Sequence, residues 1–256
     1  MLLANKNIVI MGVANERSIA WGIAKSLHEQ GARLIFTYRK ERSLQKLQQL
    51  LQKEDVEAKA IVCCDVDQDE SITAAFRQIE AEVGVLHGLV HSIAYAEKEE
   101  LQGEYVDTTR TGYLIAQNAS AYSLVAVAKE AKRLMPEGGS IVTQSYIGAE
   151  RVMKNYNVMG VAKAALEASV RYLAEDLGKY EIRVNAVSAG PIRTLAAKGV
   201  SGFNDIMSVI EERAPLRRNV DQAEVGDATM FLLSHLSRGI TGEVIHVDAG
   251  YHIIGM

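Results

Sequence analysis

The sequence predicts an α/β protein built on a doubly wound parallel sheet of about seven strands, with helices on both faces. Short apolar runs rich in β-branched residues alternate with helical patterns along all 256 residues, which is typical of parallel strands buried on both faces. No Pro- or Ser-rich linker and no shift in composition divides the chain, so we expect residues 1–256 to form a single domain. A content of 48% hydrophobic and 23% charged residues indicates a globular protein.

The strands are predicted from largely apolar runs that lie between turn residues. There are seven such runs, at residues 8–11, 34–37, 60–64, 88–93, 140–143, 182–187 and 244–247. Because crossovers between parallel strands are right-handed, this order of elements predicts a Rossmann-like sheet.

Helical patterns fill the intervals between these strands. They cover residues 19–30, 42–53, 71–83, 111–134, 158–177 and about 221–235, and residues 190–213 are expected to form a loop with short helices. Gly31 and Gly84 are placed to end the first and third helices. Pro136 follows the long fourth helix and stops it. Asp221, with Glu224 three residues later, predicts a capped start for the last helix.

The charge and the cysteines exclude several classes of protein. A formal net charge of −4 argues against nucleic acid or an anionic membrane as the main partner. The first residues lack a basic segment followed by an apolar run, which predicts no signal peptide and a cytoplasmic location. Cys63 and Cys64 are adjacent, so we interpret them as small buried residues rather than a disulfide. His87 and His91 have no nearby Cys or acidic ligand, so no metal site is expected.

Residues 112–128 contain no charged side chain. The stretch is shorter than the roughly 20 residues of a membrane span and includes Gln117 and Asn118, so we expect no membrane segment. A helix that is apolar and small all round is buried on more than one side. We therefore expect the sheet to cover one face of it and another subunit to cover the other.

The turn after the first strand has features of a phosphate site. Gly12 ends the strand and Ser18 opens the following helix, although the turn does not match the G-x-G-x-x-G pattern. Backbone N–H groups, a hydroxyl and the positive end of the helix dipole would meet where the pyrophosphate of a dinucleotide can sit. An ordinary helix cap is the alternative interpretation.

The second strand ends in a basic segment that contains Arg39, Lys40 and Ser43. An acidic residue at this point binds the ribose 2′-hydroxyl of NAD in such folds, whereas a basic tip suits a 2′-phosphate, which Arg holds in a bidentate fork. We therefore predict NADPH as the preferred cofactor, with NADH possible. A solvated, charged helix start is the alternative. Asp65, at the tip of the third strand, is the next group placed to meet the adenine.

Tyr156 and Lys163 form the strongest candidate catalytic pair. If the segment between them is helical, the two side chains lie about 20° apart on one helix face and about 10.5 Å apart along the axis. A nearby ammonium stabilises phenolate, so we expect a lowered Tyr156 pKa and a proton donor for an enolate. Tyr146 follows the fifth strand, at the sheet edge where ligands bind. By spacing alone, a Tyr and a Lys on one helix are common.

Taken together, four segments resemble the bacterial NAD(P)H-dependent enoyl-acyl-carrier-protein reductases, a divergent branch of the short-chain dehydrogenase/reductases. They are Gly12 to Ala20, His91 to Ala94, Tyr156 with six residues before Lys163, and Ser188 to Thr194. The likeness covers essentially the whole chain. Ordinary members of the superfamily have Tyr-x-x-x-Lys and a glycine-rich first turn, and this chain has neither.

The resemblance implies reduction of the trans-2 double bond of an enoyl chain carried on acyl carrier protein, in bacterial fatty acid synthesis. It implies that Tyr156 stabilises the enolate, that Lys163 holds the nicotinamide ribose and that Tyr146 is a second active-site phenol. It further implies a homotetramer and a mobile substrate-binding loop at about 194–207. The implied cofactor contacts are Gly12, Ser18, Ile19, Asp65, Val66, Ile93, Lys163, Ile192, Arg193, Thr194, Leu195 and Ala196. The substrate contacts expected on the same grounds are Ala96, Tyr146, Tyr156 and Phe203.

Two other functions stay open. One is a short-chain reductase that acts on a ketone or an alcohol, which the Tyr-to-Lys spacing argues against. The other is a nucleotide-binding module without catalysis, which would not require Tyr156 and Lys163 on one helix face.

Overall fold

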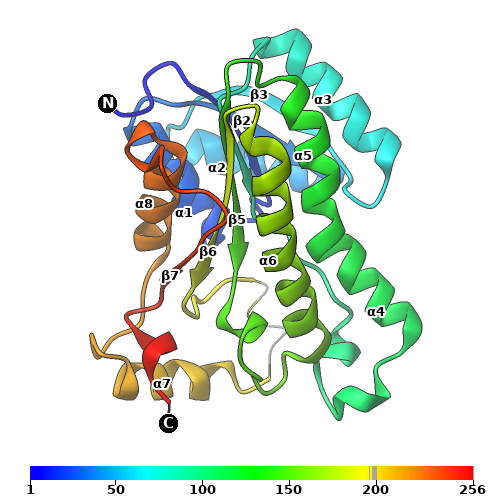
Figure 1. Ribbon diagram of the computed structural model, residues 1–256, viewed down its shortest axis with the longest axis vertical. Helices are drawn as coiled ribbons and strands as arrows, with labels where there is room; N and C mark the ends of the chain where they lie inside the picture. The colour runs from blue at the N-terminus through cyan, green and yellow to red at the C-terminus, as the bar shows by residue number, and fades with distance from the viewer. Residues whose placement is uncertain (196, 198–200, 256) are drawn as a thin grey trace.

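A fully parallel sheet forms the centre of the molecule (Figure 1). The computed structural model describes residues 1–195, 197 and 201–255, and within these residues the sheet has seven strands in the order β3-β2-β1-β4-β5-β6-β7. The fold class predicted from the sequence is confirmed. The strands are β1 (Asn7–Met11), β2 (Arg33–Tyr38), β3 (Ala58–Cys63), β4 (Gly88–His91), β5 (Gly139–Ser145), β6 (Ile182–Ala189) and β7 (Val244–Val247).

Helices cover both faces of this sheet, as Figure 1 shows. On one face lie α1 (Ile19–Glu29), α2 (Glu41–Lys53) and α8 (Gln222–Leu233). On the other lie α3 (Asp69–Val83), α5 (Ser123–Arg133) and α6 (Asn157–Gly178). Near the carboxyl ends of the strands lie α4 (Arg110–Gln117), α7 (Phe203–Arg213) and the short turns η1 (Lys98–Leu101), η2 (Tyr105–Asp107), η4 (Ile147–Ala149) and η7 (Tyr251–Ile253).

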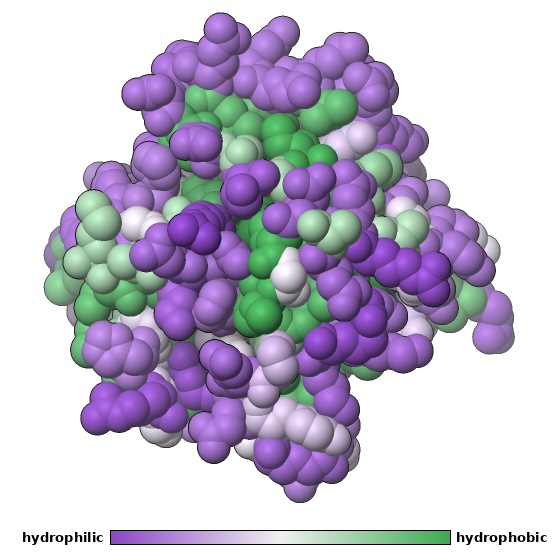
Figure 2. All heavy atoms as spheres, turned by 90° about the horizontal axis from the view of Figure 1, so that it is seen from above, coloured by the Kyte–Doolittle hydropathy of each residue, from purple (hydrophilic) through white to green (hydrophobic). Residues whose placement is uncertain are grey.

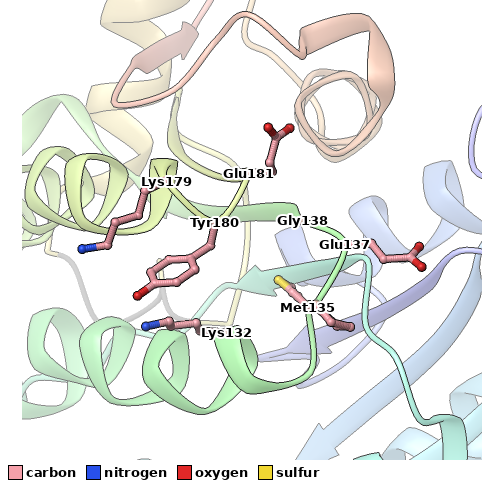
Figure 3. A pocket seen from close by; sticks show the side chains of 8 residues that line it. Lys132, Met135, Glu137, Gly138, Lys179, Tyr180 and Glu181 are labelled. Atoms are coloured by element: carbon pink, nitrogen blue, oxygen red, sulfur yellow. The ribbon is translucent and has the colours of Figure 1, made fainter.

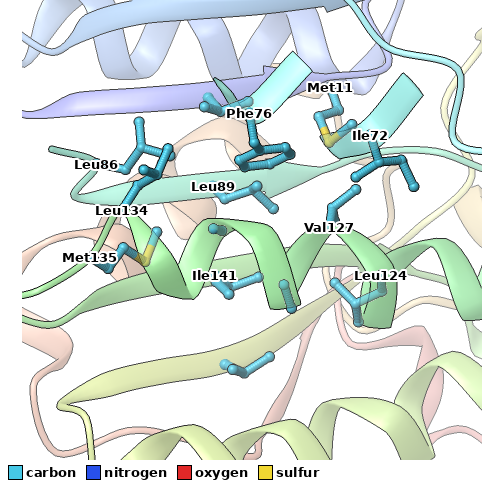
Figure 4. Close-up of a cluster of buried hydrophobic side chains, with 14 of the residues drawn as sticks. Met11, Ile72, Phe76, Leu86, Leu89, Leu124, Val127, Leu134, Met135 and Ile141 are labelled. Carbon is cyan, nitrogen blue, oxygen red and sulfur yellow. The ribbon is translucent and has the colours of Figure 1, made fainter. Parts of the chain in front are cut away.

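Each face of the sheet has its own hydrophobic core. On the α3, α5 and α6 side, Phe76, Leu89 and Leu124 are fully buried in one continuous cluster (Figure 4). On the other side, the Trp21 and Phe36 rings lie 6.4 Å apart between α1 and β2. The strands are therefore apolar on both faces, which explains why their sequences are continuous apolar runs rather than alternating ones.

The order of the strands reverses between β1 and β4, which lie side by side. From β1 the sheet continues to β2 and β3 in one direction, and from β4 it continues to β5, β6 and β7 in the other. Gly12 follows β1 with a φ of +98°, and a Cβ there would lie 1.9 Å from the Ser92 carbonyl oxygen. Only glycine fits at this contact. The crevice outside such a reversal is where open α/β sheets bind ligands, so the fold directs attention to the carboxyl ends of β1, β4 and β5.

The long helix predicted over 111–134 is interrupted by a π-helical segment. α4 ends at Gln117, residues Asn118–Tyr122 form the π-helix η3, and α5 begins at Ser123. Ser120 Oγ bonds both the N–H and the carbonyl of Tyr95, at 2.9 and 3.0 Å. The wider turn lets polar side chains reach partners near the ligand crevice, and such segments often lie at functional sites.

Three smaller expectations need correction. The fourth strand ends at His91 rather than at residue 93, because the chain turns away at the Gly12 contact. Residues 203–213, expected as loop and short helices, form the eleven-residue helix α7. Cys64 is buried as predicted, but Cys63 is exposed, because neighbours along a strand point to opposite faces and β3 is the edge strand of the sheet.

The surface is mostly polar, and exposed apolar side chains gather on α4 and η3 among other places. Hydrophilic side chains cover most of the end of the molecule where the strands begin (Figure 2). By contrast, Tyr113, Leu114 and Tyr122 on the uncharged segment are exposed, Leu114 by 59%. In the part of the chain that the structure describes, no helix has the length and apolar character that crossing a membrane requires.

Candidate active site

Two phenol rings meet at the carboxyl edge of the sheet. Tyr146 directly follows β5, Tyr156 directly precedes α6, and their ring centroids lie 5.0 Å apart in an edge-to-face arrangement. Tyr156 is therefore not the helical residue that the sequence analysis assumed, with φ −126° and ψ 0°. Asn155 before it has a φ of +61°, so a tight turn carries the chain into the helix. The structure thus brings the two predicted tyrosines together, and Tyr156 lies in a turn rather than on the helix face that it was expected to share with Lys163.

Two glycines allow this arrangement. A Cβ on Gly148, in η4, would lie 2.6 Å from Cδ1 of Tyr156. A Cβ on Gly160, in α6, would lie 2.8 Å from the carbonyl oxygen of Gly148. The turn that carries Tyr146 therefore packs directly onto the backbone of α6, and the Tyr156 ring packs against that turn.

Lys163 lies further along α6 and is only 5% exposed. Its Nζ donates a hydrogen bond of 2.7 Å to the carbonyl oxygen of Gln144 in β5. Burial lowers the pKa of Lys163 to about 8, while the nearby charge of Glu167 acts in the opposite direction. The ammonium is thus held beside β5, two residues before Tyr146.

The expected lowering of the Tyr156 pKa is wrong for the ligand-free protein. Burial raises the pKa of Tyr156 well above its usual value, and Tyr146 adds to the rise. Burial likewise raises the pKa of Tyr146 to about 12. Both phenols therefore stay protonated at neutral pH, so they can donate hydrogen bonds to a developing oxyanion.

A hollow of about 280 Å³ lies between the turn after β1 and the segment after β6. Its lining residues are Asn15, Glu16, Arg17, Thr194 and Leu195. Ser18 stands at the start of α1, but its Oγ accepts the N–H groups of Ala14 and Asn15, each at 3.0 Å. The hydroxyl therefore shapes the turn. The free N–H groups in the first turn of α1 are what face a ligand here, and they suit a pyrophosphate.

The tip of β2 differs from the expectation in one respect. The guanidinium of Arg39 is engaged by two carboxylates, Nε with Asp65 at 2.9 Å and Nη2 with Asp67 at 2.8 Å. Lys40 is exposed, and Ser43 bonds the backbone of Lys40 at the start of α2. The basic sequence suggested that the Arg39 guanidinium would be available to a 2′-phosphate. It is instead paired with two carboxylates, because the end of the third strand places Asp65 and Asp67 beside it.

The remaining predicted site residues lie around the same crevice. Ala96 and Tyr156 pack against one small buried cluster beside α6. Val66 is buried, whereas Ile19, Ile93 and Ile192 are partly buried. Phe203, partly buried, begins α7, while Arg193 is exposed. Of the predicted loop 194–207, residues 203–207 belong to α7, and Ala196 with residues 198–200 lies outside the described residues.

The sequence analysis named some polar residues of this region but missed the contacts that they make. His91 is fully buried, with Nδ1 2.9 Å from Thr143 Oγ1 and Nε2 2.9 Å from Ser123 Oγ. Burial, with Lys163 nearby, lowers the pKa of His91 to about 3, so the ring is neutral. Asn118 donates to Asp67 at 3.1 Å. Sequence spacing carries no signal for these contacts, because each joins segments far apart in the chain.

A larger hollow, of about 450 Å³, lies at the opposite end of the sheet (Figure 3). There Lys132 Nζ lies 3.9 Å from the centre of the Tyr180 ring, and Glu137 and Glu181 line the rim. None of the predicted site residues lines it. Among the described residues no group of three or more side chains that could hold a metal ion occurs.

Comparison with known proteins identifies the family. The family model for enoyl-(acyl carrier protein) reductase matches residues 12–252. An enoyl-[acyl-carrier-protein] reductase of Bacillus cereus, named for NADH, is 61% identical over 254 residues, 99% of each chain. One of Staphylococcus aureus, named for NADPH, is 59% identical over 252 residues, 98% of each chain. A crystal structure of the Bacillus cereus reductase with NADP+ and indole naphthyridinone matches with a TM-score of 0.98 and 61% identity, over 100% of this chain and 99% of that one. The resemblance seen in the sequence is confirmed, and the chain belongs to the enoyl-(acyl carrier protein) reductase family of the short-chain dehydrogenase/reductases.

Proposed function

We propose that this chain reduces the trans-2 double bond of an enoyl chain carried on acyl carrier protein, with NAD(P)H as the reductant. The observation that carries the proposal is the pair of phenols, Tyr146 and Tyr156, whose ring centroids lie 5.0 Å apart at the ligand edge of the sheet, with Lys163 buried against the Gln144 carbonyl two residues before Tyr146. Family membership over nearly the whole chain supports the same reaction.

The cofactor's expected position fits the residues present. The start of α1 and the hollow beside Thr194 and Leu195 offer N–H groups and room for a pyrophosphate. Gly12, Ser18 and Ile19 would bind at one side of it, and Ile192 to Ala196 at the other. Asp65 and Val66 would contact the adenosine, and Ile93 and Lys163 the nicotinamide half. When bound, NAD(P)H supplies the hydride for the β-carbon.

The phenols act on the other reactant, the thioester. As hydride reaches the β-carbon, the electrons of the double bond move onto the thioester carbonyl oxygen, and a proton taken up from solvent at the α-carbon then completes the reduction. Tyr156 donates a hydrogen bond to this oxygen, and its raised pKa keeps the proton in place for the role. Tyr146 is the second donor, and Lys163 holds the ribose hydroxyls. Ala96 and Phe203 line the path of the acyl chain, with residues 194–207, of which 203–207 belong to α7, as its substrate-binding segment.

The preference between cofactors is part of this proposal. Arg39, Lys40 and Ser43 gather at the tip of β2, which favours NADPH over NADH. The ion pairs of Arg39 with Asp65 and Asp67 oppose that preference, because a 2′-phosphate must compete with two carboxylates for one guanidinium. Relatives are named for either cofactor.

We also propose the assembly and setting of the enzyme. The exposed apolar side chains of the α4–η3 segment suit a subunit contact, and a homotetramer with closed symmetry would cover them. Residues 1–256 would act as one cofactor-binding and catalytic domain in the cytoplasm, with acyl carrier protein as the partner and neither nucleic acid nor membrane as a ligand.

One assay tests the reaction, and a matched pair of variants tests the cofactor. Crotonyl thioester should be reduced with loss of NAD(P)H absorbance, whereas a ketone or an alcohol should not react. Wild type should show a higher kcat/KM with NADPH than with NADH, and Arg39→Ala with Lys40→Ala should remove the difference. No turnover of the enoyl thioester would refute the reaction. A preference that survives the double substitution would refute the cofactor assignment alone.

A further inference from the structure

Glu167 is a buried acidic group that the proposed reaction does not use. It lies on α6 four residues after Lys163 and is 7% exposed. Ser145 Oγ donates a hydrogen bond of 2.5 Å to its Oε1. Because burial of a carboxyl group is unfavourable without compensating contacts, a residue of this kind in the middle of a helix requires an explanation.

The partner of Glu167 is the residue before Tyr146. Ser145 is the last residue of β5 and is 5% exposed. Beyond Tyr146, Gly148 packs onto Gly160 of the same helix α6. The active-site turn is thus attached to α6 at two points, by a hydrogen bond on one side of Tyr146 and by a close backbone contact on the other.

We propose that Glu167 is a positioning residue of the active site: its buried carboxylate ties Ser145, and through it Tyr146, to the helix that carries Lys163. One turn of helix separates Glu167 from Lys163, so the anion and the ammonium lie on the same face of α6. The residue therefore fixes a phenol on one element and supports a cation on another.

The charges around Glu167 act on this second role in both directions. Lys163 loses part of its proton affinity through burial, and the charge of Glu167 restores some of it. Burial raises the pKa of Glu167 itself, and the charge of Glu150 adds to the rise. The hydrogen bond from Ser145 and the charges of His246 and Arg171 lower that pKa. His246 in turn contacts Glu150 at 2.9 Å.

Two substitutions separate the hydrogen bond from the charge. Glu167→Gln keeps an acceptor oxygen for Ser145 but removes the negative charge. Ser145→Ala removes the hydrogen bond but keeps the charge. Glu167→Ala removes both, and Glu175→Gln changes an exposed acid on the same helix as the control. Each variant is measured as the full chain, by amide hydrogen exchange of residues 145–149 without ligand and by the pH dependence of NADPH and NADH binding.

The expected results differ between variants. Ser145→Ala and Glu167→Ala should exchange residues 145–149 about tenfold faster than wild type, whereas Glu167→Gln should not. Glu167→Gln and Glu167→Ala should move the alkaline loss of cofactor binding down by about one pH unit, because Lys163 loses a nearby anion. Glu175→Gln should change neither.

The opposite outcomes overturn the proposal. Unchanged exchange in both Ser145→Ala and Glu167→Ala would show that the turn is not held by this contact. If Glu167→Gln lost cofactor binding at the same alkaline pH as wild type, the carboxylate would not support the charge of Lys163. The proposal rests on the proposed function of Lys163 and Tyr146, but the tests are distinct. If the wild type does not reduce the enoyl thioester, or does not lose cofactor binding at alkaline pH, the proposed function is refuted. Hydrogen exchange would still show whether the contact between Glu167 and Ser145 holds the turn.

Discussion

Replacing Gly160 with alanine tests how the active-site turn is held against α6. In the interior of a helix this change alone is expected to stabilise by about 1 kcal/mol. The new Cβ, however, would lie 2.8 Å from the Gly148 carbonyl oxygen, where ordinary contact begins at 3.4 Å. Overpacking of this kind typically costs about 1–3 kcal/mol. We expect a net loss of up to about 2 kcal/mol, with the turn displaced from the helix.

The same displacement should reach the chemistry, because Tyr146 and Tyr156 both pack against Gly148. A misplacement of about 1 Å can reduce a rate about a hundredfold, so kcat should fall about ten- to a hundredfold. Gly178→Ala is the matched control, since Gly178 ends the same helix and has no atom within 4 Å of its added Cβ. Thermal unfolding midpoints and enoyl-thioester turnover are compared for both variants. If Gly160→Ala were as stable and as active as Gly178→Ala, the close contact between Gly160 and Gly148 would matter neither for stability nor for activity.

Three further predictions follow from other contacts. Asp67→Asn should raise NADPH affinity relative to NADH by about fivefold in low salt, or roughly 1 kcal/mol, because one competitor for Arg39 becomes neutral; equal changes for both cofactors in fluorescence titrations would contradict this. Lys163→Met should abolish activity yet raise stability by about 2 kcal/mol at pH 7, since lowering the folded-state pKa from 10.5 to about 8 costs the wild type roughly 3 kcal/mol, of which the lost hydrogen bond to Gln144 takes back about 1 kcal/mol. That stability gain should be full below pH 8 and vanish as pH rises toward 10.5; in urea melts, a gain independent of pH would refute it. Asp221→Ala should lower stability by about 1 kcal/mol, because its Oδ1 caps α8 through the N–H groups of Ala223 and Glu224 at 2.9 and 3.0 Å; no change in the unfolding midpoint would count against it.

The fold was predictable because its signals are local. Each strand contains a largely apolar run, and each predicted strand lies within a residue or two of its observed place. The capping box of Asp221 and Glu224 was visible in the sequence and is present in the structure. The errors arose where tertiary contacts override local pattern. The π-helical turn depends on partners such as Tyr95, which no periodicity in the helix itself reveals.

The candidate site residues could be predicted to lie near one another, but their geometry could not be predicted. Resemblance and position placed Tyr146, Tyr156 and Lys163 near one edge of the sheet. The helical spacing argument then put Tyr156 inside α6, whereas a left-handed residue at 155 places it just before the helix. The basic tip containing Arg39 was interpreted without Asp67, because β3 brings that carboxylate to it from 28 residues away.

Under the proposed function, the electrostatics of α6 let a hydrogen-bond donor and a cation act together in a buried place. A neutral phenol is useful as a donor only while its pKa stays high, and burial of Tyr156 ensures that. The same burial works against Lys163, which must stay charged to hold a polar ligand, and its pKa falls to about 8. A nearby anion is the direct remedy. This anion has to act on Lys163 without displacing the phenols. Glu167 meets that requirement because it lies one turn further along α6 than Lys163, away from Tyr156 at the start of the helix. The hydrogen bond from Ser145 then gives that carboxylate a partner other than Lys163, which leaves the ammonium available to β5 and to the ligand.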